Sequence, residues 1–128
     1  MKLLLDTCTF LWIAEQSSKL SPRAQELFLD PENAVFLSVV SVWEISVKYA
    51  TGRLALPEPP ERFIPTVRIA NRMIPMPLAE EEALHVSRMP LYHNDPFDRM
   101  LVCQSLFHGL AILSPDPKLA QYGVRMLW

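Results

Sequence analysis

The stretch Lys2-Leu3-Leu4-Leu5-Asp6-Thr7 decides the fold. A short apolar run that stops at a polar pair is typical of a strand buried on both faces of a parallel sheet, and it delivers Asp6 at the carboxyl end of that strand. The same kind of pattern recurs along the chain. Further strands are expected at residues 34–38, 110–114 and 124–128, with at most a short edge strand at 73–78, where two prolines intervene.

Helical patterns fill the segments between these strands. Helices are expected at residues 7–15, 22–29, 41–51, 61–72, 80–88 and 96–108, followed by one helical turn at 118–122. Pro65 predicts a break inside the fourth of them. Because strands alternate with helices throughout, the sequence predicts an α/β fold, a three-layer α/β/α sandwich around a mainly parallel sheet.

The composition favours one soluble domain spanning residues 1–128. Half of the residues are hydrophobic, yet no apolar stretch reaches the roughly 18 residues of a membrane span, so we expect a cytoplasmic protein with no membrane contact. The apolar excess suggests a surface covered by a partner or by a second copy. A net charge of -2 argues against binding nucleic acid through a broad basic surface. Cys8 and Cys103 are expected to be buried, reduced thiols.

The stretch His93-Asn94-Asp95-Pro96-Phe97-Asp98-Arg99-Met100-Leu101 carries two carboxylates across a proline. Asp95 suits a helix cap with Pro96 at the first helical position, which puts Asp95 and Asp98 close together at the positive end of the helix. Either the two acids only start the helix, or they also hold a cation.

Three other acids also have ordinary structural explanations. Asp6 can cap the helix after the first strand. Glu44 follows Ser41 by three residues, so a capping box explains it, and Lys48 can add a surface ion pair. Asp116 lies between two prolines, as many turn residues do.

The joint arrangement of the acids favours a metal site. Strand ends and the helix starts that follow them share one edge of a parallel sheet, where such folds bind ligands. Carboxylates gathered there without compensating lysine or arginine would repel one another, and a divalent cation would relieve that repulsion. Oxygen-only ligands suit Mg²⁺, with Mn²⁺ also possible. The chemistry this favours is metal-assisted hydrolysis of a phosphodiester, by one ion or by two ions roughly 4 Å apart.

Four segments of the sequence, in this order and spacing, resemble the PIN-domain ribonucleases, and specifically the VapC toxins of toxin-antitoxin pairs. The resemblance covers essentially the whole chain. Its carriers are Leu4-Leu5-Asp6-Thr7, Ser38-Val39-Val40-Ser41-Val42-Trp43-Glu44-Ile45, the stretch from His93 to Leu101, and Ser114-Pro115-Asp116 before Tyr122-Gly123-Val124.

The resemblance implies a PIN-like fold and a catalytic Mg²⁺ site. Its ligands would be Asp6, Glu44, Asp98 and Asp116, with Asp95 either a further ligand through water or only a helix cap. Where the family usually has threonine two residues before the last acid, this chain has Ser114, which keeps the hydroxyl. The implied reaction is RNA cleavage that leaves a 5′-phosphate and a 3′-hydroxyl.

The resemblance also implies partners. Members of the family commonly form homodimers, are neutralised by a small antitoxin protein, and reach DNA only through that antitoxin. Two alternatives stay open: a PIN-fold binding module that engages a partner without cleaving RNA, and a housekeeping nuclease that is not a toxin. The sequence does not identify the target RNA.

The neighbours of the acids have less specific assignments. We expect His93 to be a loop hydrogen-bonding residue and not a catalytic one. Lys48, Arg53, Arg99 and Lys118 could contact phosphate, although solvated side chains are the default for surface cations. The aromatic residues Trp12, Phe36, Trp43 and Phe97 are expected to belong to the core and not to stack on bases.

Overall fold

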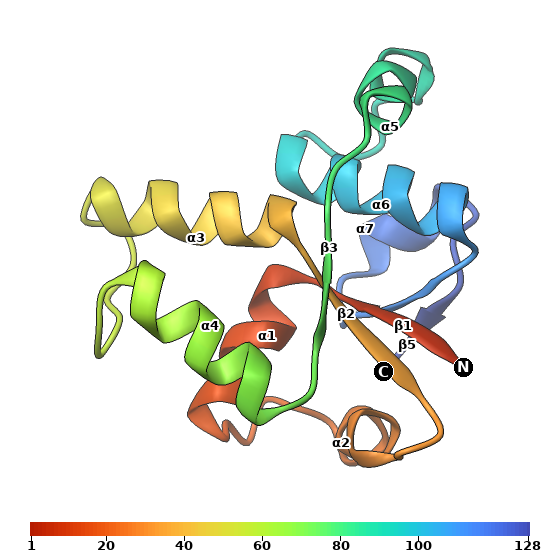
Figure 1. Ribbon diagram of the computed structural model, residues 1–128. Coiled ribbons are helices and arrows are strands. Elements are labelled where there is room, and N and C mark those ends of the chain that lie inside the picture. Colours follow the sequence, from red (N-terminus) through yellow and green to blue (C-terminus); the bar gives the residue numbers. More distant parts are fainter.

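The computed structural model describes residues 1–128 and contains one five-stranded sheet in the order β3-β2-β1-β4-β5. All neighbouring strands are parallel. The strands are β1 (Lys2–Leu5), β2 (Ala34–Ser38), β3 (Ile74–Met76), β4 (Ala111–Leu113) and β5 (Met126–Leu127). The buried β1 therefore lies at the centre of the sheet, as Figure 1 shows, and the proline-containing β3 is confirmed as a short edge strand.

Seven α-helices and one 3₁₀ helix connect the strands. They are α1 (Thr7–Glu15), α2 (Pro22–Leu29), α3 (Val39–Ala50), α4 (Pro60–Ala70), α5 (Glu80–His85), the 3₁₀ helix η1 (Val86–Arg88), α6 (Pro96–His108) and α7 (Pro117–Ala120). None of these helices has the length and apolar character needed to cross a lipid bilayer. The predicted α/β class with a parallel sheet between helices is confirmed.

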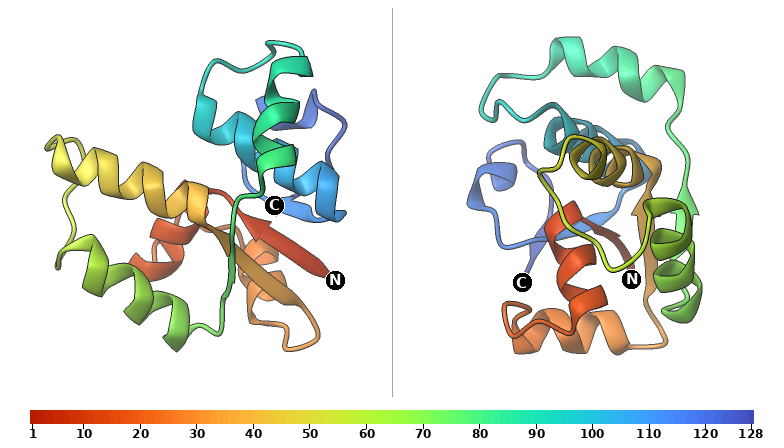
Figure 2. Two further views of the ribbon diagram at one scale, coloured as in Figure 1. Left: turned by 45° about the horizontal axis from the view of Figure 1, so that its top comes forward. Right: turned by 90° about the vertical axis from the view of Figure 1, so that its left-hand side faces the viewer.

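Alternate residues of the central strand face two separate helical layers. Leu3 and Leu5 belong to a cluster that includes Phe10 of α1 and Ala24 of α2. Leu4 belongs to a different cluster, with Leu101 of α6. This alternation is what a strand covered on both faces requires. Figures 1 and 2 show the result, with α1, α2 and α4 on one side of the sheet and α5, α6 and α7 on the other.

Helix α3 begins at Val39, two residues earlier than expected. The side chain of Ser38, and not that of Ser41, caps the helix by accepting a hydrogen bond from the Val40 amide. The predicted capping box between Ser41 and Glu44 is therefore wrong, and both residues are buried inside the helix. The structural explanation offered for Glu44 is removed by this shift.

Helix α4 continues through Pro65, so the expected break is also wrong. Only the first turn of the helix precedes Pro65. Pro65 has no N–H, so the helix lacks one backbone hydrogen bond, the one to the carbonyl of Glu61. This bond lies at the start of the helix, where few backbone hydrogen bonds precede it. The two cysteines are both free, as predicted, but Cys8 is exposed while Cys103 is buried.

Candidate active site

The carboxyl edge of the sheet gathers acids from four separate helix starts. Asp6 caps α1 directly after β1, and Asp116 caps α7 shortly after β4. Asp98 lies in the first turn of α6, which Asp95 caps. Glu44 projects from the second turn of α3, the helix that follows β2. The parallel topology thus brings chain-distant carboxylates to one edge, because every strand ends there.

Asp6 is a buried carboxylate that is held by hydrogen bonds. Its Oδ1 accepts the amide of Thr9 at 2.8 Å. Burial raises its pKa, whereas hydrogen bonds from Ser114 and Thr9 oppose that rise. Ser114 also accepts the amide of Asp116 at 3.1 Å. The hydroxyl at position 114 therefore interacts with two of the acids.

Glu44 is buried and uses both carboxylate oxygens. Its Oε1 accepts the hydroxyl of Thr7 at 2.7 Å, and its Oε2 forms an ion pair with Lys48 one turn further along α3. This pairing raises the pKa of Lys48. The expected ion pair between Glu44 and Lys48 is thus present, and Lys48 compensates the charge of one of the acids.

Asp98 and Asp116 converge on a single imidazole. The Nε2 atom of His93 lies 3.0 Å from Asp98 Oδ2 and 3.2 Å from Asp116 Oδ2. Ligand atoms of these three residues all lie within 4.8 Å of one another. His93 was expected to be only a loop hydrogen-bonding residue, and the sequence carried no signal that it would sit between two of the acids.

The other ring nitrogen identifies the tautomer of His93. Its Nδ1 accepts the backbone amide of Asp95 at 3.1 Å, so this nitrogen carries no proton. In the neutral ring the proton then resides on Nε2, which donates toward the two carboxylates. A metal-binding histidine instead donates from its second nitrogen and binds through a bare one. His93 therefore acts as a hydrogen-bond donor to the acids and does not itself offer a metal ligand in this arrangement.

Asp95 has the geometry of a helix cap. One of its oxygens, Oδ1, accepts the amides of Phe97 at 2.8 Å and of Asp98 at 3.2 Å. Its negative charge also acts on the site, because it is the strongest charge effect raising the pKa of Asp98. The predicted capping role is confirmed.

Asp98 is the acid whose ionisation the fold opposes most clearly. Burial raises its pKa to about 7, with further contributions from the negative charges of Asp95, Glu44 and Asp6, while His93 lowers it. The acids act on a neighbouring thiol as well: partial burial, and then the negative charges of Asp6, Glu44 and Asp98, raise the pKa of Cys8 to about 11. The carboxylates are therefore close enough to destabilise one another's charged forms.

A divalent cation fits this set of residues. Mutual repulsion and desolvation both disfavour the ionised acids, and a hard cation bound to oxygen relieves both effects. The four predicted acids do not form one tight cluster in the structure. Asp98 and Asp116 approach closely through His93, while Asp6 and Glu44 lie outside that group, although their negative charges still act on Asp98.

Two further expectations about the surroundings change. Arg99 is not available for phosphate, because its Nη2 donates to the carbonyls of Val86 and Met89 and thereby ties α6 to η1. Trp43 is not a core residue, since 59% of its surface is exposed.

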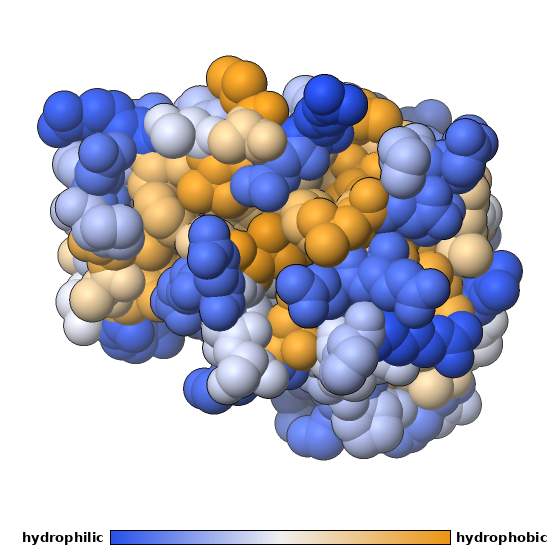
Figure 3. All heavy atoms as spheres, turned by 90° about the horizontal axis from the view of Figure 1, so that it is seen from below, coloured by the Kyte–Doolittle hydropathy of each residue, from blue (hydrophilic) through white to orange (hydrophobic).

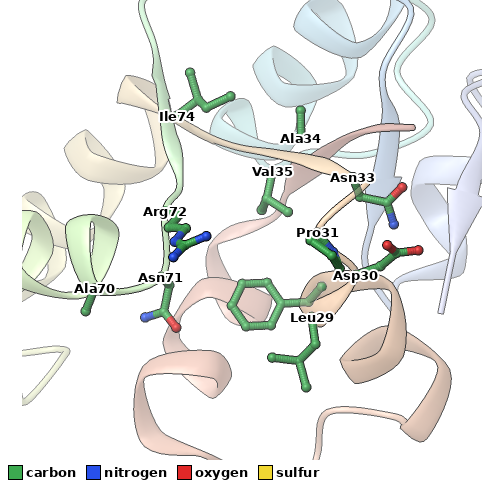
Figure 4. Close-up of a pocket in the computed structure, with 11 residues that line it drawn as sticks. Leu29, Asp30, Pro31, Asn33, Ala34, Val35, Ala70, Asn71, Arg72 and Ile74 are labelled. Atoms are coloured by element: carbon green, nitrogen blue, oxygen red, sulfur yellow. The ribbon is translucent and has the colours of Figure 1, made fainter.

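The pocket shown in Figure 4 is a separate feature at the opposite edge of the sheet. It lies between the end of α2 and the chain leading into β3, and it is lined by Asp30, Val35, Arg72 and Ile74 among others. These residues flank the amino ends of β2 and β3, whereas the acids follow the carboxyl ends of the strands. This pocket therefore contributes nothing to the acidic site.

Comparisons with known proteins agree with this fold. Solved VapBC structures match nearly the whole chain. VapBC2 from Rickettsia felis, bound to a promoter DNA fragment, matches at 9% identity and TM-score 0.74, and the match covers 100% of this chain and 99% of that one. DNA-bound VapBC from Salmonella typhimurium matches at 19% identity and TM-score 0.70, and VapBC-1 from nontypeable Haemophilus influenzae at 18% and 0.68, each covering 99% of this chain and 97% of the other.

Matches at such low identity establish the fold. A comparison with curated proteins gives no match. The sequence itself matches the family described as PIN domain over residues 3–124, which is nearly its full length. The chain therefore belongs to the PIN domain family.

Proposed function

We propose that the protein is a Mg²⁺-dependent endoribonuclease, with Mn²⁺ able to replace Mg²⁺, whose metal site is formed by Asp6, Glu44, Asp98 and Asp116. PIN domains are nucleases that generally use divalent metal ions. The observation that carries the proposal is the convergence of these acids at one sheet edge, where the pKa of Asp98 rises to about 7. An acid site with this electrostatic conflict is stabilised by the cation that the reaction needs.

The chain's own residues prepare the acids for that cation. Thr7 fixes the position of Glu44 through its hydroxyl, and Lys48 holds the other oxygen of the same carboxylate. Ser114 favours the ionised form of Asp6. His93 supplies one Nε2 proton between Asp98 and Asp116, which keeps their carboxylates oriented toward a common point.

The bound ion would activate water for attack on phosphorus and neutralise charge on the leaving oxygen, giving 5′-phosphate and 3′-hydroxyl ends. No nucleophilic side chain is needed for this reaction. Asp95 has one oxygen engaged in capping α6, so a contribution to the ion would come through water at most.

We further propose that the protein acts as the toxin of a toxin-antitoxin pair. The support is the likeness of its fold to the toxin subunits of VapBC complexes, together with its exposed apolar surface. Figure 3 shows one face on which apolar side chains lie in patches between polar ones. Leu29 at the end of α2 and Ile69 near the end of α4 are among the exposed apolar residues. Such surface suits an antitoxin and a second copy of the chain, and DNA would be reached only through the antitoxin.

The proposal is tested by incubating the purified protein with a panel of structured and unstructured RNAs, with Mg²⁺, with Mn²⁺ and with EDTA. Asp6→Asn and Asp98→Asn should abolish cleavage, because each removes a charged ligand while preserving shape. Glu81→Gln, an exposed acid on α5, is the matched control and should leave cleavage unchanged. Cleavage in the presence of EDTA would contradict the assignment. Cleavage by both Asp variants at the wild-type rate would contradict it as well.

The toxin role needs a separate measurement. Induced expression in a bacterial host should arrest growth, and Asp98→Asn should relieve the arrest. If the wild-type protein cleaves RNA but its expression leaves growth normal, the protein is a housekeeping nuclease and not a toxin. Growth arrest by the Asp98→Asn variant, with no RNA cleavage by either protein, would indicate a binding module.

A further inference from the structure

An exposed tryptophan is fixed beside the acidic site. Trp43 precedes Glu44 on α3, and its ring packs edge to face on Phe97, with ring centroids 4.8 Å apart and planes at 76°. Phe97 precedes Asp98 on α6. The indole is thus held between the two helices that carry Glu44 and Asp98, with more than half of its surface still open to solvent.

A second aromatic pair lies on the other side of the site. Tyr92 precedes His93 and packs against Tyr122, with ring centroids 5.1 Å apart. The phenol oxygen of Tyr122 accepts the backbone amide of His93 at 3.0 Å. Tyr92 exposes 49% of its surface. Each exposed ring is therefore one residue from a side chain of the site, and each is supported by a second ring.

The sheet order separates these two pairs. Trp43 belongs to the helix after β2, whereas Tyr122 follows the helix after β4, and β2 and β4 flank β1 on opposite sides. Asp6, at the end of β1, lies between the two strands. An extended strand of nucleic acid crossing the carboxyl edge would thus meet one aromatic pair before the acids and the other pair after them.

We propose that Trp43 and Tyr92 are stacking subsites for unpaired bases on the two sides of the scissile phosphate. This inference rests on the proposed nuclease function. With a net charge of -2, the protein has no overall excess of the positive charge that supplies much of the affinity in nucleic-acid complexes. Stacking on rigid aromatic faces supplies affinity without positive charge, and it requires bases that are not hidden in a duplex.

The first experiment observes the stack directly. The chain has three tryptophans. Trp12 and Trp128 pack on each other, whereas Trp43 packs on Phe97. The double variant Trp12→Phe/Trp128→Phe leaves Trp43 as the sole tryptophan. A 12-nucleotide oligoadenylate, added with Ca²⁺ in place of Mg²⁺, should quench its fluorescence in a saturable manner. A duplex of the same length should quench it much less. Absence of quenching at concentrations where the oligonucleotide binds would overturn the proposal.

The second experiment measures the energetic role. Trp43→Ala and Tyr92→Ala should each weaken oligoadenylate binding, followed by fluorescence anisotropy, by roughly 5-fold or more, and should raise KM with a smaller change in kcat. The matched control is Phe107→Ala. Phe107 is 47% exposed and packs edge to face on His85, but it lies at the far end of α6 from Asp98.

An abasic substrate separates stacking from general damage. Removing the base next to the cleavage point should weaken wild-type binding and should add nothing in the variant that has lost the matching ring. Stacking would be refuted if Phe107→Ala weakened binding as much as Trp43→Ala and Tyr92→Ala do. It would also be refuted if the abasic substrate weakened the binding of these two variants as much as it weakens that of the wild type. Variants that bind RNA normally but change the oligomeric mass would assign the rings to an interface between copies instead.

Failure of the two proposals can be told apart. If the wild type cleaves RNA and the alanine variants keep its KM, the stacking subsites are wrong and the nuclease stands. If no RNA is cleaved in Mg²⁺ or Mn²⁺ but oligoadenylate still quenches Trp43, the nuclease is wrong and the single-strand site stands.

Discussion

Thr7 donates its hydroxyl hydrogen to Glu44 across 2.7 Å, which joins the first residue of α1 to a residue of α3 that lies 37 positions further along the chain. The same oxygen lies 3.0 Å from the hydroxyl of Ser41. All three residues are buried, so water cannot replace the donor if it is lost. Thr7 is therefore a positioning residue for one of the four proposed metal ligands.

Thr7→Val should impair the site without unfolding the protein. Valine preserves the shape of threonine and removes its hydroxyl, so Glu44 loses a hydrogen bond worth roughly 1.5 to 3 kcal/mol. We expect Mg²⁺ affinity, measured by titration calorimetry, and kcat/KM for RNA to fall roughly 10-fold or more. Thr7→Ser, which restores the hydroxyl, should recover most of both. Equal loss in the serine and valine variants would show that the methyl group matters and the hydrogen bond does not.

The neutral imidazole ring of His93 should carry its proton on Nε2 and not on Nδ1. The amide of Asp95 occupies Nδ1, and two carboxylate oxygens face Nε2. Nitrogen-15 chemical shifts of the imidazole ring distinguish the tautomers directly. A protonated Nδ1 would contradict the assignment and would return His93 to the list of possible metal ligands. His85, on α5, provides an internal reference in the same spectrum.

The sequence predicted the sheet well because its signals are local. Apolar runs of strand length specify buried strands, and capping residues such as Ser21 and Asp95 specify helix starts. The acids could be assigned to one edge because parallel topology places strand ends together. The distances between the acids could not be predicted, since they depend on side-chain directions that are set by tertiary contacts.

The errors have the same origin. Ser38 and Ser41 are equally good caps by sequence, and the end of β2 decides between them. Trp43 falls in an apolar pattern, yet the position of α6 leaves its ring on the surface. Glu82 is buried although the two acids before it at the start of α5 are exposed, and no sequence signal distinguishes the three. Periodicity measures which face of an element is apolar, and it says little about a single residue at the rim of that face.

Glu82 should therefore matter for stability although it is remote from the proposed chemistry. Its carboxylate accepts the Ala79 amide at 3.1 Å and the Gln104 amide group at 3.3 Å, and it pairs with His108. Glu82→Ala should lower the free energy of unfolding by roughly 2 to 4 kcal/mol, measured in urea, because it leaves buried donors unpaired. Glu81→Ala, at the neighbouring exposed position, should change it by less than about 0.5 kcal/mol. Equal effects of the two substitutions would contradict this account.

The metal-free protein should lose stability as the pH rises from about 4 to about 7. The pKa of Asp98 is raised from 3.8 to about 7 in the folded state, so between these values the folded chain binds more protons than the unfolded chain. The free energy of unfolding then falls with increasing pH across that window, by roughly 1 to 3 kcal/mol in total. The pKa of Asp6 is raised too, which acts in the same direction. Thermal unfolding in EDTA at a series of pH values measures the effect.

Two variants assign this pH dependence to the acidic site. Asp98→Asn removes the titrating group and should flatten the profile, raising the Tm at pH 8 while leaving it nearly unchanged at pH 4. Asp95→Asn keeps a side-chain oxygen for the cap but removes the strongest negative charge acting on Asp98, so it should shift the window to lower pH. Adding Mg²⁺ should stabilise the wild type more at pH 8 than at pH 5, because ionised carboxylates bind the cation and protonated ones do not. A profile unchanged in the Asp98→Asn variant would place the titrating group elsewhere and remove the electrostatic basis for the cation.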